Sequence, residues 1–181
     1  MKIKFFSHPL NIGKLLYLYG FGMWMTIITI NNINDPETNI FYIKNMVEMN
    51  LFNNINDTNI GQGLRWRALH STWVSHFLIW CIIVFELVID FFMWRAFLSL
   101  LSDSWKGISA TKKTINKVNV ALSWMIGLFS LLITGGIWFA YWIHMGAFQM
   151  VHLTAIVWCV LGFILFNFTG NNFNDKCAED L

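Results

Sequence analysis

Long apolar stretches separated by short polar ones dominate the chain. The clearest stretch runs from Ala68 to Phe85, eighteen residues without Asp, Glu, Lys or Arg. About 20 apolar residues at ~1.5 Å rise per residue cross a hydrocarbon layer of ~30 Å. This pattern predicts a membrane-spanning helix over about residues 68–94.

Three further apolar stretches have the same character. They predict spanning helices over about residues 15–30, 118–143 and 148–168, the last two joined by a tight turn at 144–147. The fold class expected is therefore all-α: a polytopic membrane protein with four transmembrane helices, forming a single membrane domain over residues 1–181.

The polar segments between these stretches predict an outer loop at 31–67, an inner loop at 95–117 and a tail at 169–181. Within the outer loop, Phe41, Val47 and Leu51 recur at roughly helical spacing among polar residues. That spacing is typical of a short amphipathic helix. We expect it to fold onto the bundle together with Phe52, and to be capped by Thr38 or Asn39.

The distribution of Lys and Arg predicts the orientation. Basic residues gather in the N-terminal arm and the inner loop, whereas the outer loop mixes Lys44, Arg65 and Arg67 with four carboxylates. Cytoplasmic flanks carry the excess of Lys and Arg. The termini are thus expected on the cytoplasmic or matrix side of an inner membrane, bacterial or mitochondrial with an AT-rich genome.

Composition supports membrane insertion and excludes one class of partner. The chain is 56% hydrophobic and 12% charged, against roughly 25% charged in soluble domains. A net charge of +2 and the lack of a basic run exclude nucleic acid. Three cysteines without C-x-x-C spacing indicate neither a disulfide framework nor a thiolate metal site.

Histidines gather at the predicted outer half of the bundle. His76 near the start of the second predicted span, His144 at the end of the third and His152 near the start of the fourth lie at similar depth, a placement that suits a haem or a metal ion. The alternative, which we favour, is that they satisfy hydrogen bonds between helices or sit at the interface. The sequence requires no cofactor and leaves its identity open.

Two carboxylates, Glu86 and Asp90, share one face of the second predicted span. An ionisable group at membrane depth is a functional candidate because it costs ~2.5–3.5 kcal/mol on insertion scales. In the structural interpretation Asp90 pairs with Arg95 and Glu86 bonds another helix; in the functional one the pair handles protons.

The helix partner expected for Glu86 comes from residues at matching depth: Ser123, Trp124, Asn167, Tyr17 or Tyr19. Arg67 is a further structural polar site, at the outer end of the second span. No Ser-His-Asp, Walker or HExxH pattern is present, so no enzymatic activity is expected.

Several segments together resemble a known family. They are NNINDPETN after the first span, RWRAL followed by His76, Trp80 and Glu86, and GGIWFAYW before an aromatic-rich last helix. In this order, over about residues 15–168, the chain resembles the uncharacterised small integral membrane proteins of domain of unknown function 2165. The resemblance implies a four-helix inner-membrane protein and supplies no activity.

Three functions compete at this stage. The first is an accessory or structural subunit of a larger membrane complex, for example a respiratory one, with the lipid bilayer and other membrane subunits as partners. The second is a haem- or metal-binding redox protein using the outer histidines. The third is a small proton-coupled transporter using Glu86 and Asp90, ranked last because the other spans carry no charge to continue a path.

Overall fold

The chain folds into helices joined by short turns, as seen in a computed structural model that describes residues 9–53 and 60–168. Within these residues the regular elements are helical throughout. The α-helices are α1 (Pro9–Asn34), α2 (Pro36–Val47), α3 (Thr72–Trp105), α4 (Lys112–Trp138) and α5 (Trp142–Asn167), with 3-10 turns η2 (Asn50–Phe52) and η3 (Gln62–Arg67) between α2 and α3.

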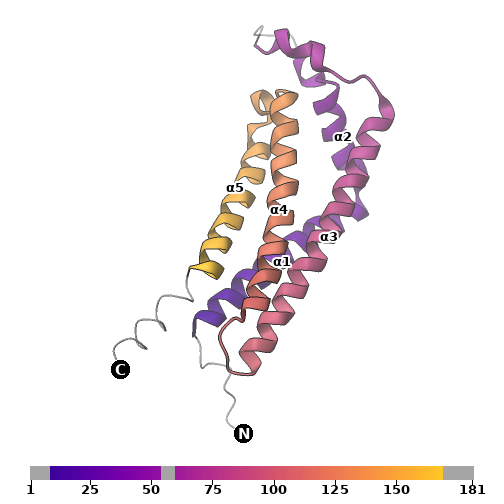
Figure 1. The fold of residues 1–181 in the computed structure, drawn as a ribbon. Coiled ribbons are helices and arrows are strands. Elements are labelled where there is room, and N and C mark those ends of the chain that lie inside the picture. Colours follow the sequence, from indigo (N-terminus) through magenta and orange to yellow (C-terminus); the bar gives the residue numbers. More distant parts are fainter. Residues whose placement is uncertain (1–8, 54–59, 169–181) are drawn as a thin grey trace.

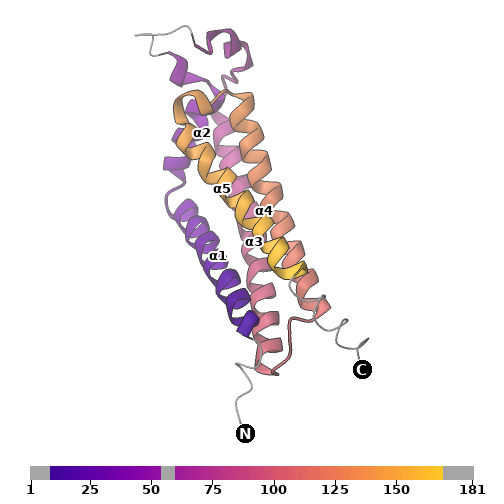
Figure 2. The ribbon, with the colours of Figure 1, turned by 90° about the vertical axis from the view of Figure 1, so that its left-hand side faces the viewer.

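The long helices form one elongated bundle. α4 packs against both α3 and α5, and α1 runs alongside α3 in the opposite direction (Figures 1 and 2). The start of α1, the α3–α4 connection and the end of α5 lie at one end, and α2 lies at the other. The core between the helices is apolar and includes Leu18, Met25, Met93, Leu122 and Phe166, all almost fully buried.

Three of the four expected membrane spans are candidate spans in the structure, and the first is not. In the described part of the chain, three helices are long and apolar enough to cross a membrane, namely α3, α4 and α5. α1 has the length, at 26 residues, but polar Asn11, Lys14 and the asparagines of its last turn lower its mean hydropathy. Counting charges alone overlooked this difference, because Asn and Tyr are uncharged and still costly in hydrocarbon.

The helices also extend well beyond the predicted spans. α3 continues for 34 residues to Trp105, so the first half of the expected inner loop is helical. It ends where Gly107 takes a φ of +70°, a backbone conformation that favours glycine. α4 begins after Thr111, whose side chain accepts from the backbone N–H of Thr114 as an N-cap.

The turn between α4 and α5 lies earlier than predicted. Residues 139–141 form it, with Ala140 at a φ of +53°, whereas the sequence placed it at 144–147. At the predicted position the structure has a kink inside α5, at Met145. His144 and Gly146 thus indicated an irregularity inside α5, and not the beginning of this helix.

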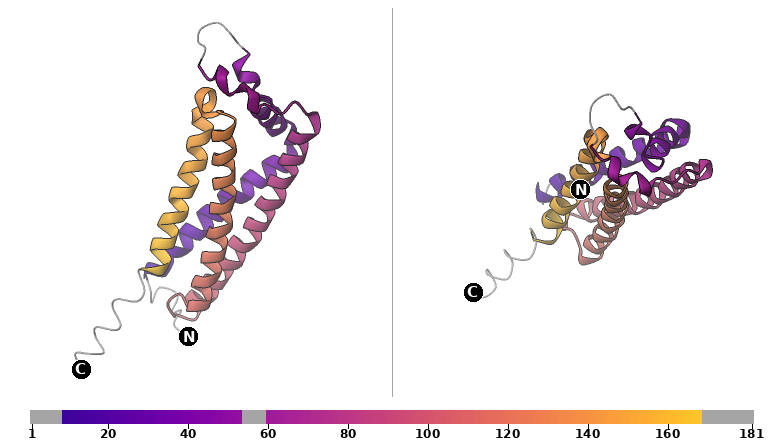
Figure 3. Two further views of the ribbon diagram at one scale, coloured as in Figure 1. Left: turned by 45° about the horizontal axis from the view of Figure 1, so that its top comes forward. Right: turned by 90° about the horizontal axis from the view of Figure 1, so that it is seen from above.

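The outer segment folds onto the bundle, as expected from its apolar spacing. Val47 and Phe52 are buried, and Phe52 packs with Met49 against Ala140, where α4 leads into α5. The segment that follows α2 lies at this end of the bundle (Figure 3). Phe41 departs from the expectation, with 62% of its surface exposed. The N-cap also differs from the prediction: the Asp35 carboxylate accepts from the backbone N–H of Thr38, so Asp35 caps α2.

Candidate functional site

One face of α3 combines apolar and acidic side chains. Ile79, Ile83, Glu86 and Met93 are buried and recur every three to seven residues, which places them on one side of the helix. Asp90, one turn after Glu86, is half-buried on the same side. Because α1 packs against this face, both carboxylates point toward another helix, as the sequence predicted for Glu86.

Glu86 is held by an amide from α1. Asn32 Nδ2 donates to Oε1 at 2.7 Å and to Oε2 at 2.9 Å, while only 4% of the Glu86 surface remains exposed. Asn39 Nδ2 of α2 donates to Asn32 Oδ1 at 2.7 Å. The donor from α2 fixes the orientation of the Asn32 amide and leaves its NH2 group for the carboxylate, so three helices meet in one hydrogen-bonded chain.

Asp90 has a separate hydroxyl partner on α1. Thr26 Oγ1 donates to Asp90 Oδ1 at 3.1 Å and accepts from Trp94 Nε1 at 3.0 Å. Since an indole N–H can only donate, the Thr26 hydroxyl hydrogen is free to point at the carboxylate. The two hydrogen bonds therefore run from Trp94 of α3 through Thr26 of α1 to Asp90, which is again on α3.

The partners of both carboxylates are neutral. Among residues 9–53 and 60–168, no basic side chain hydrogen-bonds to Glu86 or Asp90. A buried charge without a counter-ion is costly, and hydrogen bonds from amide and hydroxyl groups offset part of that cost. Chemically the arrangement can join helices through hydrogen bonds, and it can take up a proton or a cation.

The sequence located Glu86 and Asp90 but missed the groups that hold them. In the described structure Glu86 bonds to none of its proposed partners, which were Ser123, Trp124, Asn167, Tyr17 and Tyr19. The prediction ended the first helix at Ile30, one residue before Asn31. α1 continues to Asn34, and this extra turn carries Asn32 to Glu86. The sequence signal that could have revealed this partner was the pair Asn31 and Asn32, directly after the apolar stretch.

Comparison with known proteins adds a family. A family model described as "Predicted small integral membrane protein (DUF2165)" matches residues 10–169. The chain belongs to this family. No curated protein and no solved structure shows a significant match. The resemblance seen in the sequence is thereby confirmed, and so is the integral membrane character of the protein.

The histidines of this DUF2165 protein have local partners. His76 is exposed, with Nδ1 2.9 Å from the carbonyl oxygen of Thr72 in the same helix. The His144 ring stands edge-on to Phe52, and His152 Nδ1 lies 3.4 Å from Gln149 Oε1. Within residues 9–53 and 60–168, no group of three His, Cys, Asp or Glu side chains could hold a metal ion. A haem held by two of them stays a prediction.

Arg67 connects the outer segment to the end of α4. Its guanidinium carbon lies 4.8 Å from the ring centroid of Trp138 and 5.3 Å from that of Trp66, and Nη1 donates to the Trp138 carbonyl at 3.1 Å. Arginine stacked on indole rings gains cation–π attraction. Arg67 therefore packs the outer segment of this DUF2165 protein against the end of α4.

Arg95 does not pair with Asp90, contrary to the structural interpretation of the sequence. Arg95 is exposed, and Asp90 bonds to Thr26 instead. Residues five apart on a helix point in different directions, which accounts for the separation. Arg95 lies beside Lys112, Lys113 and Lys117 of α4.

Proposed function

We propose that this DUF2165 protein is an accessory or structural subunit of a larger membrane complex, with no catalytic role. The observation that carries the proposal is the Asn39–Asn32–Glu86 chain, which joins α2, α1 and α3. Glu86 there makes its hydrogen bonds within the bundle. A carboxylate used in this way stabilises helix packing.

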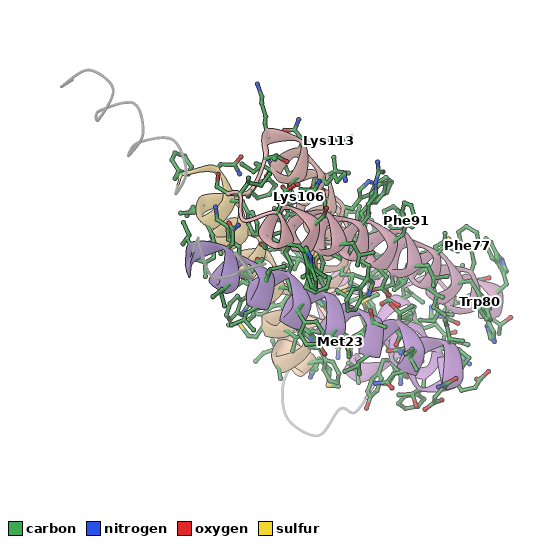
Figure 4. The ribbon with its side chains drawn as sticks, turned by 90° about the horizontal axis from the view of Figure 1, so that it is seen from below. Met23, Phe77, Trp80, Phe91, Lys106 and Lys113 are labelled. Carbon is green, nitrogen blue, oxygen red and sulfur yellow. The ribbon has the colours of Figure 1, made fainter. Side chains whose placement is uncertain are left out.

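The outward surface of α3 supports the same proposal. Phe77, Trp80 and Phe91 project from it and are 56%, 53% and 62% exposed (Figure 4). Lipid covers such side chains in a membrane, and so would the helix of a neighbouring subunit. Aromatic side chains supply large contact areas at interfaces. The partner we propose is therefore another membrane subunit that packs against α3.

The proposed location is an inner membrane, with both termini on the cytoplasmic or matrix side. The start of α1, the α3–α4 connection and the end of α5 lie at one end of the bundle (Figure 1). Lys14, Lys106, Lys112, Lys113 and Lys117 belong to that end, against Lys44, Arg65 and Arg67 at the other. This asymmetry of basic residues supports the proposed orientation.

Co-purification tests the subunit role. The chain is tagged and expressed in its native membrane, extracted in mild detergent and analysed for proteins recovered at fixed stoichiometry. We expect a larger complex, with Glu86→Gln behaving as the parent and Glu86→Leu recovering less partner, because glutamine keeps a hydrogen-bonding group. Mass spectrometry of the recovered subunits also tests the respiratory assignment. A monodisperse chain without partners would contradict the proposal.

A second candidate is a proton-linked role for Glu86 and Asp90. It is favoured by one observation: the two carboxylates lie one turn apart and neither has a basic hydrogen-bond partner in the described residues. Glu86→Gln separates the candidates, because its amide oxygen keeps an acceptor for one of the two Asn32 hydrogen bonds while the titratable carboxyl group is lost. Normal assembly with loss of proton flux in reconstituted vesicles would favour the second candidate over the first.

A further inference from the structure

Two hollows lie next to each other on the face between α3 and α4. The first, about 550 Å³, is lined by Arg95 of α3 and by three lysines at the start of α4: Lys112, Lys113 and Lys117. The second, about 510 Å³, is lined mostly by apolar groups, among them Phe85, Trp124, Gly127 and Leu131. The apolar hollow lies farther along α4, toward its middle.

A stacked pair of aromatic rings lies between the two hollows. Phe92 lines the basic hollow and stacks on Trp124 of the apolar one, with ring centroids 6.2 Å apart and planes at 13°. Trp124 also contacts Phe85, at 5.5 Å between centroids. Gly127 leaves open space, since a Cβ added there would meet nothing within 4 Å. The two hollows therefore meet at the Phe92–Trp124 pair, and we call them together the groove: a cationic hollow followed by an apolar one.

The basic hollow has no carboxylate of its own. None of its lining residues in the described part of the chain is acidic. The carboxylate of Asp103 is occupied elsewhere, accepting from the hydroxyls of Thr111 and Thr114 at 2.9 and 2.6 Å. Lys117 is positioned by a neutral group, since its Nζ donates to Ser99 Oγ at 2.8 Å. Within residues 9–53 and 60–168, the four cations of this hollow thus have no carboxylate partner.

The depth of the groove matches the membrane boundary. The uncharged part of α4, residues 118–138, is long enough for the ~30 Å hydrocarbon layer. Lys117 then lies at its edge, and Lys112 and Lys113 lie among the headgroups. Figure 4 shows Lys113 at this end of the bundle. Basic pockets between transmembrane helices on this side suit phosphate-bearing lipid headgroups.

We propose that this groove binds one anionic phospholipid, with its phosphate among Arg95, Lys112, Lys113 and Lys117 and an acyl chain along Trp124 and Gly127. Charge complementarity selects the headgroup, and the apolar continuation distinguishes a lipid from a free phosphate ion. Zwitterionic lipid fits the apolar end equally well and gains little at the basic end.

The test uses the 181-residue chain in nanodiscs of mixed phosphatidylglycerol and phosphatidylcholine. Native mass spectrometry after detergent release counts the lipids retained. We expect one phosphatidylglycerol to be retained in preference to phosphatidylcholine. Arg95→Gln with Lys117→Gln should lower that preference roughly twenty-five-fold, at about fivefold for each cation removed near the surface. Lys112→Gln with Lys113→Gln should act similarly without touching the Lys117–Ser99 bond.

Matched controls keep the result specific. Lys44→Gln with Arg65→Gln removes two exposed cations at the other end of the bundle and should leave the preference unchanged. Gly127→Phe should fill the apolar end and reduce retention, while Gly20→Phe, at another open glycine on α1, should not. Circular dichroism and size exclusion verify that each variant is folded.

Three outcomes would overturn the proposal. They are equal retention of the two lipids by the parent chain, unchanged preference in both charge variants, and binding of inorganic phosphate with no lipid retained, which would indicate a phosphate site alone. None of these bears on the subunit role proposed above, because lipid retention is measured on the isolated chain.

Discussion

Asn32 on α1 donates to both carboxylate oxygens of Glu86 on α3, at 2.7 and 2.9 Å. The two residues are 54 positions apart in the sequence, and their contact fixes how α1 and α3 align. From Thr26 to Asn32 the chain advances along α1, while the partner on α3 moves back from Asp90 to Glu86. This is the register of two antiparallel helices, secured at two points one turn apart on α3.

The first prediction concerns the energy of the Asn32–Glu86 contact. Glu86→Leu should destabilise the bundle, because the Asn32 amide loses its acceptor, and the coupling should be about 0.6–1.7 kcal/mol, as for hydrogen bonds between membrane helices. Unfolding in a mixed-detergent titration measures it. Adding Asn32→Leu should recover part of the loss, since removing both polar partners avoids an unsatisfied group. Additive effects of the two substitutions would contradict direct coupling.

The second prediction tests the chain through Thr26. Thr26→Val keeps the shape and removes both the donor to Asp90 and the acceptor of Trp94, so it should destabilise the bundle by about 1 kcal/mol. Thr26→Ser should retain the stability. Thr154→Val is the matched control, because that exposed hydroxyl bonds only to the carbonyl of Met150 in its own helix. An equal loss in both Val variants would show that the Asp90 contact contributes nothing.

The third prediction concerns the close approach of α1 to α5 at Gly162. A methyl group at Gly162 would lie 2.8 Å from Tyr17 Cζ and 2.9 Å from Leu122 Cδ1. Gly162→Ala should therefore destabilise the protein by roughly 1–3 kcal/mol through overpacking. Gly127→Ala, where space is open, should cause no loss. If the two variants unfold alike, Tyr17 moves aside without cost and the contact does not hold α1 in place.

Sequence reasoning succeeded where a property is local. The apolar stretches predicted α3, α4 and α5 as long helices, and the i,i+4 spacing of Glu86 and Asp90 placed both on one face. It failed where the structure depends on a contact between segments far apart in the sequence. Nothing near Asn32 in the sequence indicates that its amide meets Glu86, because that contact depends on how far α1 extends and on its register against α3.

The ends of the helices were also predicted wrongly from the sequence. The predicted spans followed the charged residues, whereas the helices end at backbone signals such as Gly107 and the Thr111 cap. Arg95 lies inside α3, since a helix can continue into the headgroup layer with charged side chains turned outward. A hydropathy pattern therefore locates the apolar part of a helix and not its ends.

The fourth prediction concerns topology. Arg65→Cys and Lys112→Cys, each in a background without Cys81, Cys159 and Cys177, should be labelled from opposite sides of the membrane. Both positions are exposed and belong to opposite ends of the bundle. Membrane-impermeant maleimide added to sealed inverted vesicles should reach residue 112, and added to intact cells or spheroplasts it should reach residue 65. Labelling of both from one side would refute the proposed orientation.

The last prediction concerns attachment of the outer segment. Phe52 is 3% exposed, its ring lies 4.6 Å from that of His144, and it packs against Met49 and Ala140. Phe52→Ala removes this contact, and a buried Phe→Ala change costs ~3–5 kcal/mol when the site cannot collapse. Part of that cost should appear as local opening, so trypsin should cut after Arg65 at least tenfold faster than in the parent chain. Phe41→Ala is the control, because Phe41 is 62% exposed and its removal should leave the rate unchanged. Rapid cleavage of the parent chain at Arg65 would mean that Phe52 and the Arg67 contacts with Trp66 and Trp138 do not hold the segment against the bundle in the membrane.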